Sequence, residues 1–164
     1  MVISSLEERT TFGNLSRSEL MRRVRSAGNL TTEQALVRLL RQEAITGWRR
    51  NVKMFGRPDF IWRRQRIAVF VDGCFWHGHA CGRNLSPKRN ISFWQKKIDN
   101  NKRRDRRIAR ELRARNWRVL RVWECTLKKS PGRFIKTLKN AMEMAKLEHR
   151  GIEIPTPEDT NSAS

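Results

Sequence analysis

The sequence predicts a single α/β domain, and three observations lead to this prediction. The run Ile67 to Val71 is continuous and apolar, which is typical of a strand covered on both faces. Apolar residues between Ala35 and Leu40 recur at helical spacing, and those between Phe134 and Ala145 do the same. At 164 residues, 38% of them apolar, the chain is long enough to bury one hydrophobic core.

The N-terminal part is predicted to contain two helices. Residues 1–15 are expected to form a flexible arm, and the domain itself is expected to span residues 16–150. Ser16 and Glu19 have the spacing of a capping box, so a short helix is expected to start there. A second helix starts at residues 31–34 and carries Glu33 in its first turn. The residues alone favour a simple role for Glu33, a carboxylate that stabilises the helix N-terminus.

Three strands are predicted next. Residues 48–55 alternate roughly between polar and apolar, which predicts a first strand. After a turn at 56–58, residues 59–62 predict a second strand, and the Arg-rich stretch 63–66 turns the chain into the run at Ile67. Asp72 and Gly73 end this third strand.

A loop, a long helix, a fourth strand and a final helix complete the prediction. Pro87 excludes helix from the loop at 82–90, and a basic helix is expected over 92–115 with Asn116 as its C-cap. Residues 117–123 predict a strand and residues 132–149 the last helix, before a disordered tail at 151–164. Four tryptophans are assigned to the core: Trp48, Trp62, Trp117 and Trp123.

The charge points to a polyanionic partner. The net charge is +20, from 36 Lys and Arg against 16 Asp and Glu. Nucleic acid is the expected partner, although charge alone does not separate it from the alternatives of a ribosomal-type protein or acidic lipid. No apolar run is long enough to cross a bilayer, and the N-terminus lacks the features of a signal peptide, so a cytoplasmic location is expected.

Cysteine and histidine are concentrated in one short stretch. Two of the three cysteines and two of the three histidines lie between Cys74 and Cys81. Together with the third cysteine they make a complete set of thiolate and imidazole donors for a structural Zn2+: Cys74, His79, Cys81 and Cys125. The alternative is a group of buried free cysteines with a surface histidine, because the spacing is not that of a standard zinc finger.

Two acids flank the apolar strand and suggest a second metal site. Asp59 starts one predicted strand and Asp72 ends the next, so both carboxylates can reach one edge of the sheet. These oxygens, with the carbonyl of Val71, suit Mg2+, and His77 is near enough in sequence to transfer a proton. The alternative, that Asp59 caps a turn and Asp72 a strand end, is at least as strong from spacing alone.

Aromatic residues follow the same strand. Phe75 and Trp76 lie in a loop between metal-ligand candidates, where no helical or strand period explains them. Exposed aromatics on a rigid basic loop can wedge between base pairs, and Trp94 can join them. For Phe93 and Trp94, a place in the core is the competing interpretation.

Several motifs resemble one known family: GRPDF (56–60), AVFVDGCFWHGHAC (68–81), FWQKKI (93–98) and WRVLRVWEC (117–125). They are similar to motifs of the very short patch repair endonucleases, the Vsr-type DNA mismatch nickases. The segments 16–26 and 31–41 resemble the N-terminal helices of that family. The resemblance covers about residues 16–126, in order and without large gaps.

The resemblance implies a restriction-endonuclease-like PD-(D/E)xK core, in which helices flank a mixed central β-sheet. The family nicks one strand on the 5′ side of the thymine in a T:G mismatch, which arises when 5-methylcytosine deaminates. The implied partners are double-stranded DNA with that mismatch, a cytosine-5 DNA methyltransferase as a functional link, and mismatch-repair proteins. We expect a monomer.

The resemblance also implies a role for each site residue. Asp59 would be the central Mg2+ ligand, with the carbonyl of Val71 as another, and His77 the catalytic histidine. The zinc ligands would be Cys74, His79, Cys81 and Cys125, and the aromatic wedge would be Phe75, Trp76 and Trp94. Glu33 matches a helix-borne acid near the active site, which favours a catalytic role over a capping role.

One departure concerns the end of the apolar strand. The best-known members of the family have Thr-His where this chain has Val71 and Asp72. Val71 can supply the same carbonyl. Asp72 either adds a metal ligand or leaves His77 to act alone.

Two other functions remain open from the sequence. One is a restriction or homing-type endonuclease on the same core, and the other is a non-catalytic, zinc-stabilised DNA-binding module. The joint presence of Asp59, Asp72 and His77 argues against the binding module.

Overall fold

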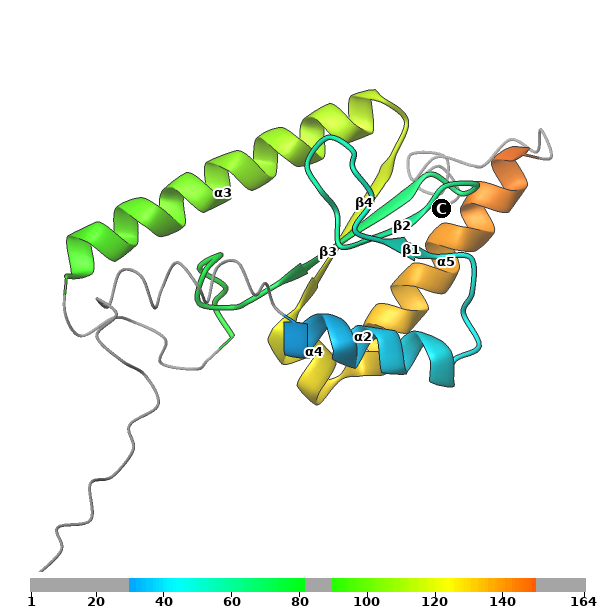
Figure 1. Cartoon of the computed structure of the whole chain (residues 1–164), viewed down its shortest axis with the longest axis horizontal. Coiled ribbons are helices and arrows are strands. Elements are labelled where there is room, and N and C mark those ends of the chain that lie inside the picture. Colours follow the sequence, from blue (N-terminus) through cyan, green and yellow to red (C-terminus); the bar gives the residue numbers. More distant parts are fainter. Residues whose placement is uncertain (1–29, 82–89, 150–164) are drawn as a thin grey trace, which may run out of the picture.

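The computed structural model describes residues 30–81 and 90–149 (Figure 1). The expected N-terminal arm, the helix from Ser16, most of the loop at 82–90 and the C-terminal tail lie outside these described residues. The elements in order are α2 (Leu30–Gln42), β1 (Arg49–Arg50), β2 (Phe60–Trp62), β3 (Ile67–Asp72), α3 (Ile91–Ala114), β4 (Arg118–Trp123), α4 (Glu124–Lys129) and α5 (Pro131–His149).

The four strands form one mixed sheet in the order β1-β2-β3-β4. β2 pairs antiparallel with β1 and β3, whereas β3 and β4 are parallel, with Asp72 opposite Trp123. Because β2 runs against its neighbour, its first residues lie beside the last residues of β3. The start of β2 and the ends of β3 and β4 therefore meet at one edge of the sheet.

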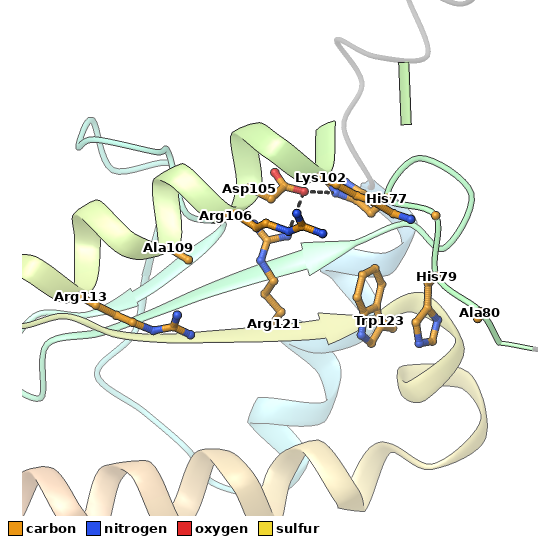
Figure 2. A pocket seen from close by; sticks show the side chains of 11 residues that line it. His77, His79, Ala80, Lys102, Asp105, Arg106, Ala109, Arg113, Arg121 and Trp123 are labelled. Atoms are coloured by element: carbon orange, nitrogen blue, oxygen red, sulfur yellow. Dashed lines mark hydrogen bonds and ion pairs between the residues drawn. The ribbon is translucent and has the colours of Figure 1, made fainter. Parts of the chain in front are cut away.

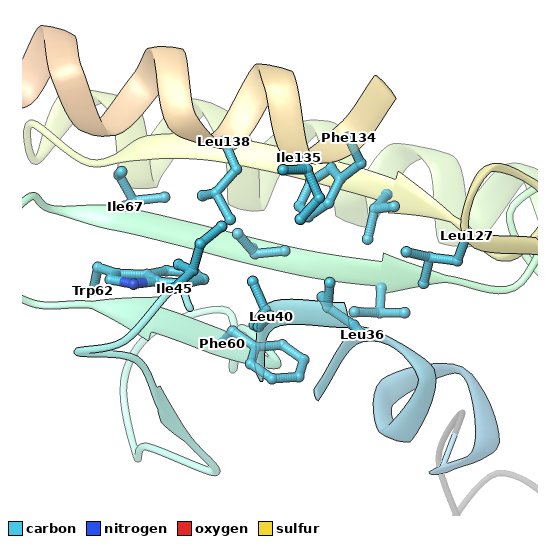
Figure 3. Close-up of a cluster of buried hydrophobic side chains, with 13 residues drawn as sticks. Leu36, Leu40, Ile45, Phe60, Trp62, Ile67, Leu127, Phe134, Ile135 and Leu138 are labelled. Carbon is cyan, nitrogen blue, oxygen red and sulfur yellow. The ribbon is translucent and has the colours of Figure 1, made fainter. Parts of the chain in front are cut away.

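Both faces of β3 are covered, as the continuous apolar run predicted. All six residues of β3 are buried. Ile67, Val69 and Val71 face α2, α4 and α5, where they pack in the main core with residues such as Leu36 and Leu138 (Figure 3). The alternate side chains belong to a smaller cluster under α3, made by Ala68, Phe70 and Leu112. This period of two also places the side chain of Asp72 on the α3 face.

Helix α3 covers its face of the sheet with only its C-terminal half. Its buried residues are Ala109 and Leu112, and Figure 1 shows the N-terminal half extending beyond the sheet. Gly56 allows the turn before β2 to touch this helix, since a Cβ there would lie 2.4 Å from Cγ2 of Ile108. The turn before Asp59 thus packs directly beneath α3. Among the described residues, no helix combines the length and the apolar character needed to span a bilayer.

Two parts of the predicted fold are wrong. The strand expected over 48–55 is reduced to Arg49–Arg50, because Asn51 and Gly56 have left-handed backbone angles, φ 54° and 78°, that bend the chain away. Directly after β4, Glu124 begins the six-residue helix α4, which was not predicted. The expected C-cap at Asn116 is off by one residue: Arg115 is the C-cap of α3, and Asn116, the next residue, has the left-handed φ of 59° that often follows a helix.

Candidate functional site

Two hydrogen bonds hold Asp59 against the end of β3. Its main-chain N–H donates to the carbonyl of Val69 at 3.0 Å, and its Oδ2 accepts the N–H of Val71 at 2.7 Å. Asp59 therefore lies beside Val71 at the edge where the strand ends converge. The sequence predicted this proximity, and the structure brings the two residues together.

Burial raises the pKa of Asp59 to about 6. The Val71 N–H opposes this shift, while the nearby carboxylates of Glu33 and Asp72 add to it. Glu33 reaches this region from the first turn of α2 and forms an ion pair with Arg50. The surroundings of Asp59 thus favour a cation or a proton beside its carboxylate.

His77 and Asp59 line one cavity, between α3 and the ends of β2 and β3, and the imidazole ring of His77 has a carboxylate on each side. Its Nδ1 is 2.6 Å from Oδ2 of Asp105, and its Nε2 is 3.6 Å from Oδ1 of Asp72. Figure 2 shows the bridge between His77 and Asp105, which comes down from α3. The structure adds Asp105 as a partner of the ring, while the two roles predicted for Asp72, an added metal ligand or a change that leaves His77 to act alone, stay predictions.

The sequence prediction missed Asp105. It lies 28 residues from its partner along the chain, on a helix for which the sequence predicted no site residue other than Trp94. The signal was a single acid in the run KRRDRR at 102–107. Burial raises the pKa of Asp105, but the hydrogen bond to His77 and the charge of Arg121 outweigh burial, so the net pKa is lowered. Asp105 is therefore ionised and suited to orient the imidazole.

Asp72 is tied to an arginine. Its side chain is 5% exposed, and Oδ2 accepts a hydrogen bond from Nη1 of Arg121 at 2.5 Å. The same nitrogen lies 3.3 Å from Oδ2 of Asp105. Burial raises the pKa of Asp72, although His77 and Arg121 partly counteract the shift. The expectation that Asp72 marks the strand end near Asp59 is confirmed, but Arg121 was not foreseen as its partner.

Two cavities meet at His77. One, of about 490 Å³, lies between α3 and the ends of β2 and β3 and is lined by Asp59, Val71, Asp72 and His77, among others. The other, of about 460 Å³, lies between α3 and β4 (Figure 2). The first therefore collects four of the residues that the sequence singled out, whereas Glu33 does not line it and acts on Asp59 through its charge.

The four cysteine and histidine candidates also come together. The ligand atoms of Cys74, His79, Cys81 and Cys125 all lie within 4.8 Å of one another. Tetrahedral zinc with bonds of about 2.3 Å needs donors about 3.8 Å apart, so small side-chain movements would close the set around an ion. The donor set fits a soft metal, whereas the oxygen donors at Asp59 and Val71 fit a hard one.

Trp123 belongs to this cluster and not to the core. Its ring stacks on the imidazole of His79, with centroids 4.2 Å apart and an interplanar angle of 5°. Its assignment to the core is wrong, because the alternation along β4 turns it toward α3 and the cavity beside His77. The assignment is confirmed for Trp62, which is fully buried, and Trp48 and Trp117 pack against the core clusters.

The aromatic candidates form one partly exposed cluster beyond the end of the sheet. Phe75, Trp76 and Trp94 contact one another edge to face, with centroids 5.1 to 5.7 Å apart. The ammonium of Lys97 lies 5.8 Å from the ring of Trp76 and 5.5 Å from that of Trp94. Phe93 is 58% exposed, so its alternative place in the core is wrong.

The loop that carries these groups is packed tightly on α3. The side-chain amide of Asn101 donates to the carbonyl of Trp76 at 2.8 Å. Gly78 has a φ of 59°, and a Cβ there would lie 2.6 Å from Cγ2 of Ile98. Residues 73–81 therefore hold His77, the aromatic cluster and three metal-ligand candidates in one fixed arrangement.

Comparison with known proteins gives consistent matches. The family described as DNA mismatch endonuclease Vsr matches residues 10–83. The type II nicking enzyme V.XorIIP of Xanthomonas oryzae pv. oryzae is 39% identical over 111 residues, which cover 68% of this chain and 81% of that protein. The DNA mismatch endonuclease Vsr of Escherichia coli is 37% identical over 113 residues, covering 69% and 72%. A further relative, the type II nicking enzyme V.NmeAIP of Neisseria meningitidis, is 36% identical over 102 residues.

The raised pKa of Asp59 predicts a pH-dependent effect of its replacement. Because the folded-state pKa of about 6 exceeds the usual 3.8, stability from this group is present at low pH and is lost as pH rises through that window. Asp59→Asn removes the buried charge and can still accept the N–H of Val71. In magnesium-free buffer we expect the variant to be more stable than wild type at pH 8 by on the order of 2 kcal/mol, and by less at pH 5.

Urea unfolding at the two pH values measures this difference. No chelator is added, so that any metal bound by the cysteine cluster is retained. A variant less stable than wild type at pH 8 would show that the carboxylate of Asp59 is well neutralised by the protein itself.

Proposed function

This chain belongs to the Vsr family of DNA mismatch endonucleases, and we propose that it nicks one DNA strand on the 5′ side of the thymine in a T:G mismatch. Its activity class, a DNA endonuclease of very short patch repair, follows from the family. The observation that carries the finer proposal is the shared cavity of Asp59, Asp72 and His77, in a loop-bearing region that also carries the partly exposed aromatic cluster. We further propose that the core is of the PD-(D/E)xK type, and that Pro58 and Asp59 are the first two residues of that motif.

We propose that the carboxylate of Asp59 and the carbonyl of Val71 hold Mg2+. Both are oxygen donors, and the desolvated carboxylate lies beside two further acids, Glu33 and Asp72, which makes the site favourable for a divalent cation. When bound, the ion supplies polarisation of the phosphate and acidification of a water molecule. In this arrangement Glu33 adds negative charge behind Asp59, and its ion pair with Arg50 fixes its position.

His77 is proposed to transfer a proton during hydrolysis. Asp105 at Nδ1 favours a proton on that nitrogen, which leaves Nε2, 3.6 Å from Oδ1 of Asp72, as the nitrogen that gains or loses the transferred proton. In the reaction the water oxygen forms a bond to phosphorus and the bond from phosphorus to the leaving sugar oxygen breaks. The water loses a proton and the leaving oxygen gains one. Asp105 acts as a positioning residue, because its carboxylate orients the imidazole through Nδ1.

We propose a structural zinc ion at Cys74, His79, Cys81 and Cys125. Four protein ligands leave no open coordination position, so the ion would have no catalytic role. It would tie the loop after β3 to α4, which follows β4. The stacked ring of Trp123 would hold the imidazole of His79 in its orientation.

The aromatic cluster is proposed to open the duplex at the mismatch. Phe75, Trp76 and Trp94 are carried by a loop and by the end of α3 that extends beyond the sheet. Aromatic side chains that enter between base pairs unstack them, and Lys97 beside these rings adds a positive charge for the phosphate backbone. Deamination of 5-methylcytosine would supply the substrate, so a cytosine-5 DNA methyltransferase is the proposed functional partner. Contact with mismatch-repair proteins and a monomeric state are also proposed.

A cleavage assay tests the proposed function. Labelled duplexes with a T:G mismatch or the matched T:A pair are incubated with and without Mg2+. We expect a single Mg2+-dependent nick beside the thymine of the mismatch. We expect Asp59→Ala to nick about 10³-fold more slowly, because several kcal/mol of charge stabilisation are lost, while it binds the mismatch with similar affinity.

The same assay separates the other functions. Double-strand cuts in matched DNA would indicate a restriction or homing-type endonuclease. Tight binding without cleavage would indicate a DNA-binding module. Nicking by Asp59→Ala at the wild-type rate would contradict the proposed metal site.

Metal removal tests the zinc site. Elemental analysis of the purified protein is expected to give one zinc ion per chain. Chelation should lower the thermal midpoint, since structural zinc contributes on the order of 10 kcal/mol to folding, and Zn2+ but not Mg2+ should restore it. A protein without zinc and with an unchanged midpoint after chelation would contradict the site.

Replacement of Trp76 tests the aromatic wedge. Trp76→Ala should weaken binding to the T:G duplex by about 1–3 kcal/mol, the range of one stacking contact, and should leave the thermal midpoint unchanged. Binding to matched duplex serves as the control and should change less. Equal affinities of wild type and variant for the mismatch would exclude Trp76 from the wedge.

A further inference from the structure

Arg121 occupies an unusual position on the sheet. It lies on β4 directly opposite Phe70, on the face that Val119 shares and that α3 covers. Its side chain is only 22% exposed. An apolar residue at such a position would complete the cluster beneath α3, whereas a charge taken out of water costs several kcal/mol unless it is well paired. A partly buried arginine at this position is therefore unexpected unless its charge has a role.

The contacts of Arg121 fix its position without using all its donors. Nη1 pairs with Asp72 at 2.5 Å and with Asp105 at 3.3 Å, and the guanidinium lies over the ring of Phe70, 5.0 Å from its centroid. A guanidinium has five N–H groups. Within residues 30–81 and 90–149, no acceptor contacts Nη2 or Nε. The group is thus held rigidly, with N–H donors still available for a ligand.

Those donors are located beside the proposed reaction centre. Arg121 lines both cavities that meet at His77, including the one that contains Asp59. Figure 2 shows the arginine rising from β4 to the bridge between His77 and Asp105. Three carboxylates line this cavity, Asp59, Asp72 and Asp105, and so do three further arginines, Arg57, Arg104 and Arg107, of which none forms an ion pair with Asp72. A phosphodiester that enters the cavity gains a second negative charge during hydrolysis, so a cation that ion pairs already hold in place would stabilise that state.

We propose that Arg121 is a catalytic residue, whose guanidinium donates hydrogen bonds to a nonbridging oxygen of the scissile phosphate. This inference rests on the proposed function. The planar fork of arginine matches phosphate oxygens, and its charge does not depend on pH in the working range. Asp72 and Asp105 hold Arg121 in place, so the ion pairs orient the guanidinium before the substrate arrives. The reaction is the hydrolysis described above, and Arg121 neither gains nor loses a proton in it.

Kinetics of Arg121→Met on the T:G duplex with Mg2+ test the proposal. Methionine keeps a long side chain over Phe70 but removes the charge and the donors. We expect kcat to fall by about 10²–10³-fold, as for the loss of one preorganised donor, with KM changed less than about threefold. Arg121→Lys keeps the charge but not the planar, forked set of donors, so its kcat should lie between those of wild type and Arg121→Met. Because it retains the ion pairs, it also provides a folded variant if Arg121→Met is unstable.

A sulfur substitution at the scissile phosphate distinguishes direct contact from a structural role. Each nonbridging oxygen is replaced in turn, as the two phosphorothioate diastereomers. We expect one diastereomer to slow the wild type and to lose most of this effect in Arg121→Met, because the oxygen and the guanidinium interact with each other. A residue that only neutralises Asp72 would leave both sulfur effects unchanged.

Two reference variants complete the design. Arg118→Met changes an arginine on the same strand that faces the other side of the sheet and pairs with Glu148, and it should nick at the wild-type rate. Asp59→Ala should nick about 10³-fold more slowly, as in the cleavage assay. If wild type nicks and Asp59→Ala does not, an Arg121→Met variant with normal kcat, or with both sulfur effects intact, overturns the role of Arg121 alone. If wild type does not nick the mismatch, the proposed function itself fails.

Discussion

The hydrogen bonds between Asp59 and the end of β3 determine where the rest of the site can form. The main chain of Asp59 is tied to Val69, and its carboxylate accepts the N–H of Val71. A hydrogen bond to an ionised carboxylate is stronger than one between neutral groups, so it holds the side chain against the tendency of a charge to turn toward water. Asp59 is thereby held beside Val71, and Asp72 and His77 follow Val71 along the chain. Gly56, three residues before Asp59, packs against α3 and lines the same cavity.

The site brings carboxylates and arginines together in a strongly basic protein. The net charge of +20 favours approach to DNA, and the cavity is lined by the carboxylates of Asp59, Asp72 and Asp105. These carboxylates would repel a phosphate, and arginines that line the same cavity oppose them: Arg57, Arg104, Arg107 and Arg121. We propose that a divalent ion beside Asp59 and the paired guanidinium of Arg121 supply the positive charge nearest the reaction. The loop 73–81 joins this chemistry to the aromatic cluster, because Asn101 and the close contact at Gly78 hold it on α3.

Local patterns predicted the elements that pack on both sides of the sheet, but not the contacts that α3 makes. The apolar run of β3 and the helical spacing in α2 and α5 report burial directly, so these elements were placed correctly. The alternation at 48–55 overstated a strand, since the left-handed angle at Asn51 decides the chain direction. Residue types and their clustering suggested the metal-ligand and aromatic residues, and the motif resemblance then favoured a functional role for them over the structural alternatives. Asp105 and Arg121 were missed because each has its partner far along the chain. From the neighbouring residues alone, a charged side chain on a basic helix or on a strand is expected to be exposed to solvent.

The position of the catalytic ion tests the proposed role of Asp59 most directly. Crystals of this chain with a T:G duplex, grown with Mn2+ in place of Mg2+, would locate the ion by its anomalous scattering. We expect an anomalous peak about 2.0–2.6 Å from a carboxylate oxygen of Asp59, between that residue and the scissile phosphate. A fully occupied ion bound elsewhere, with Asp59 directed away from the phosphate, would contradict it.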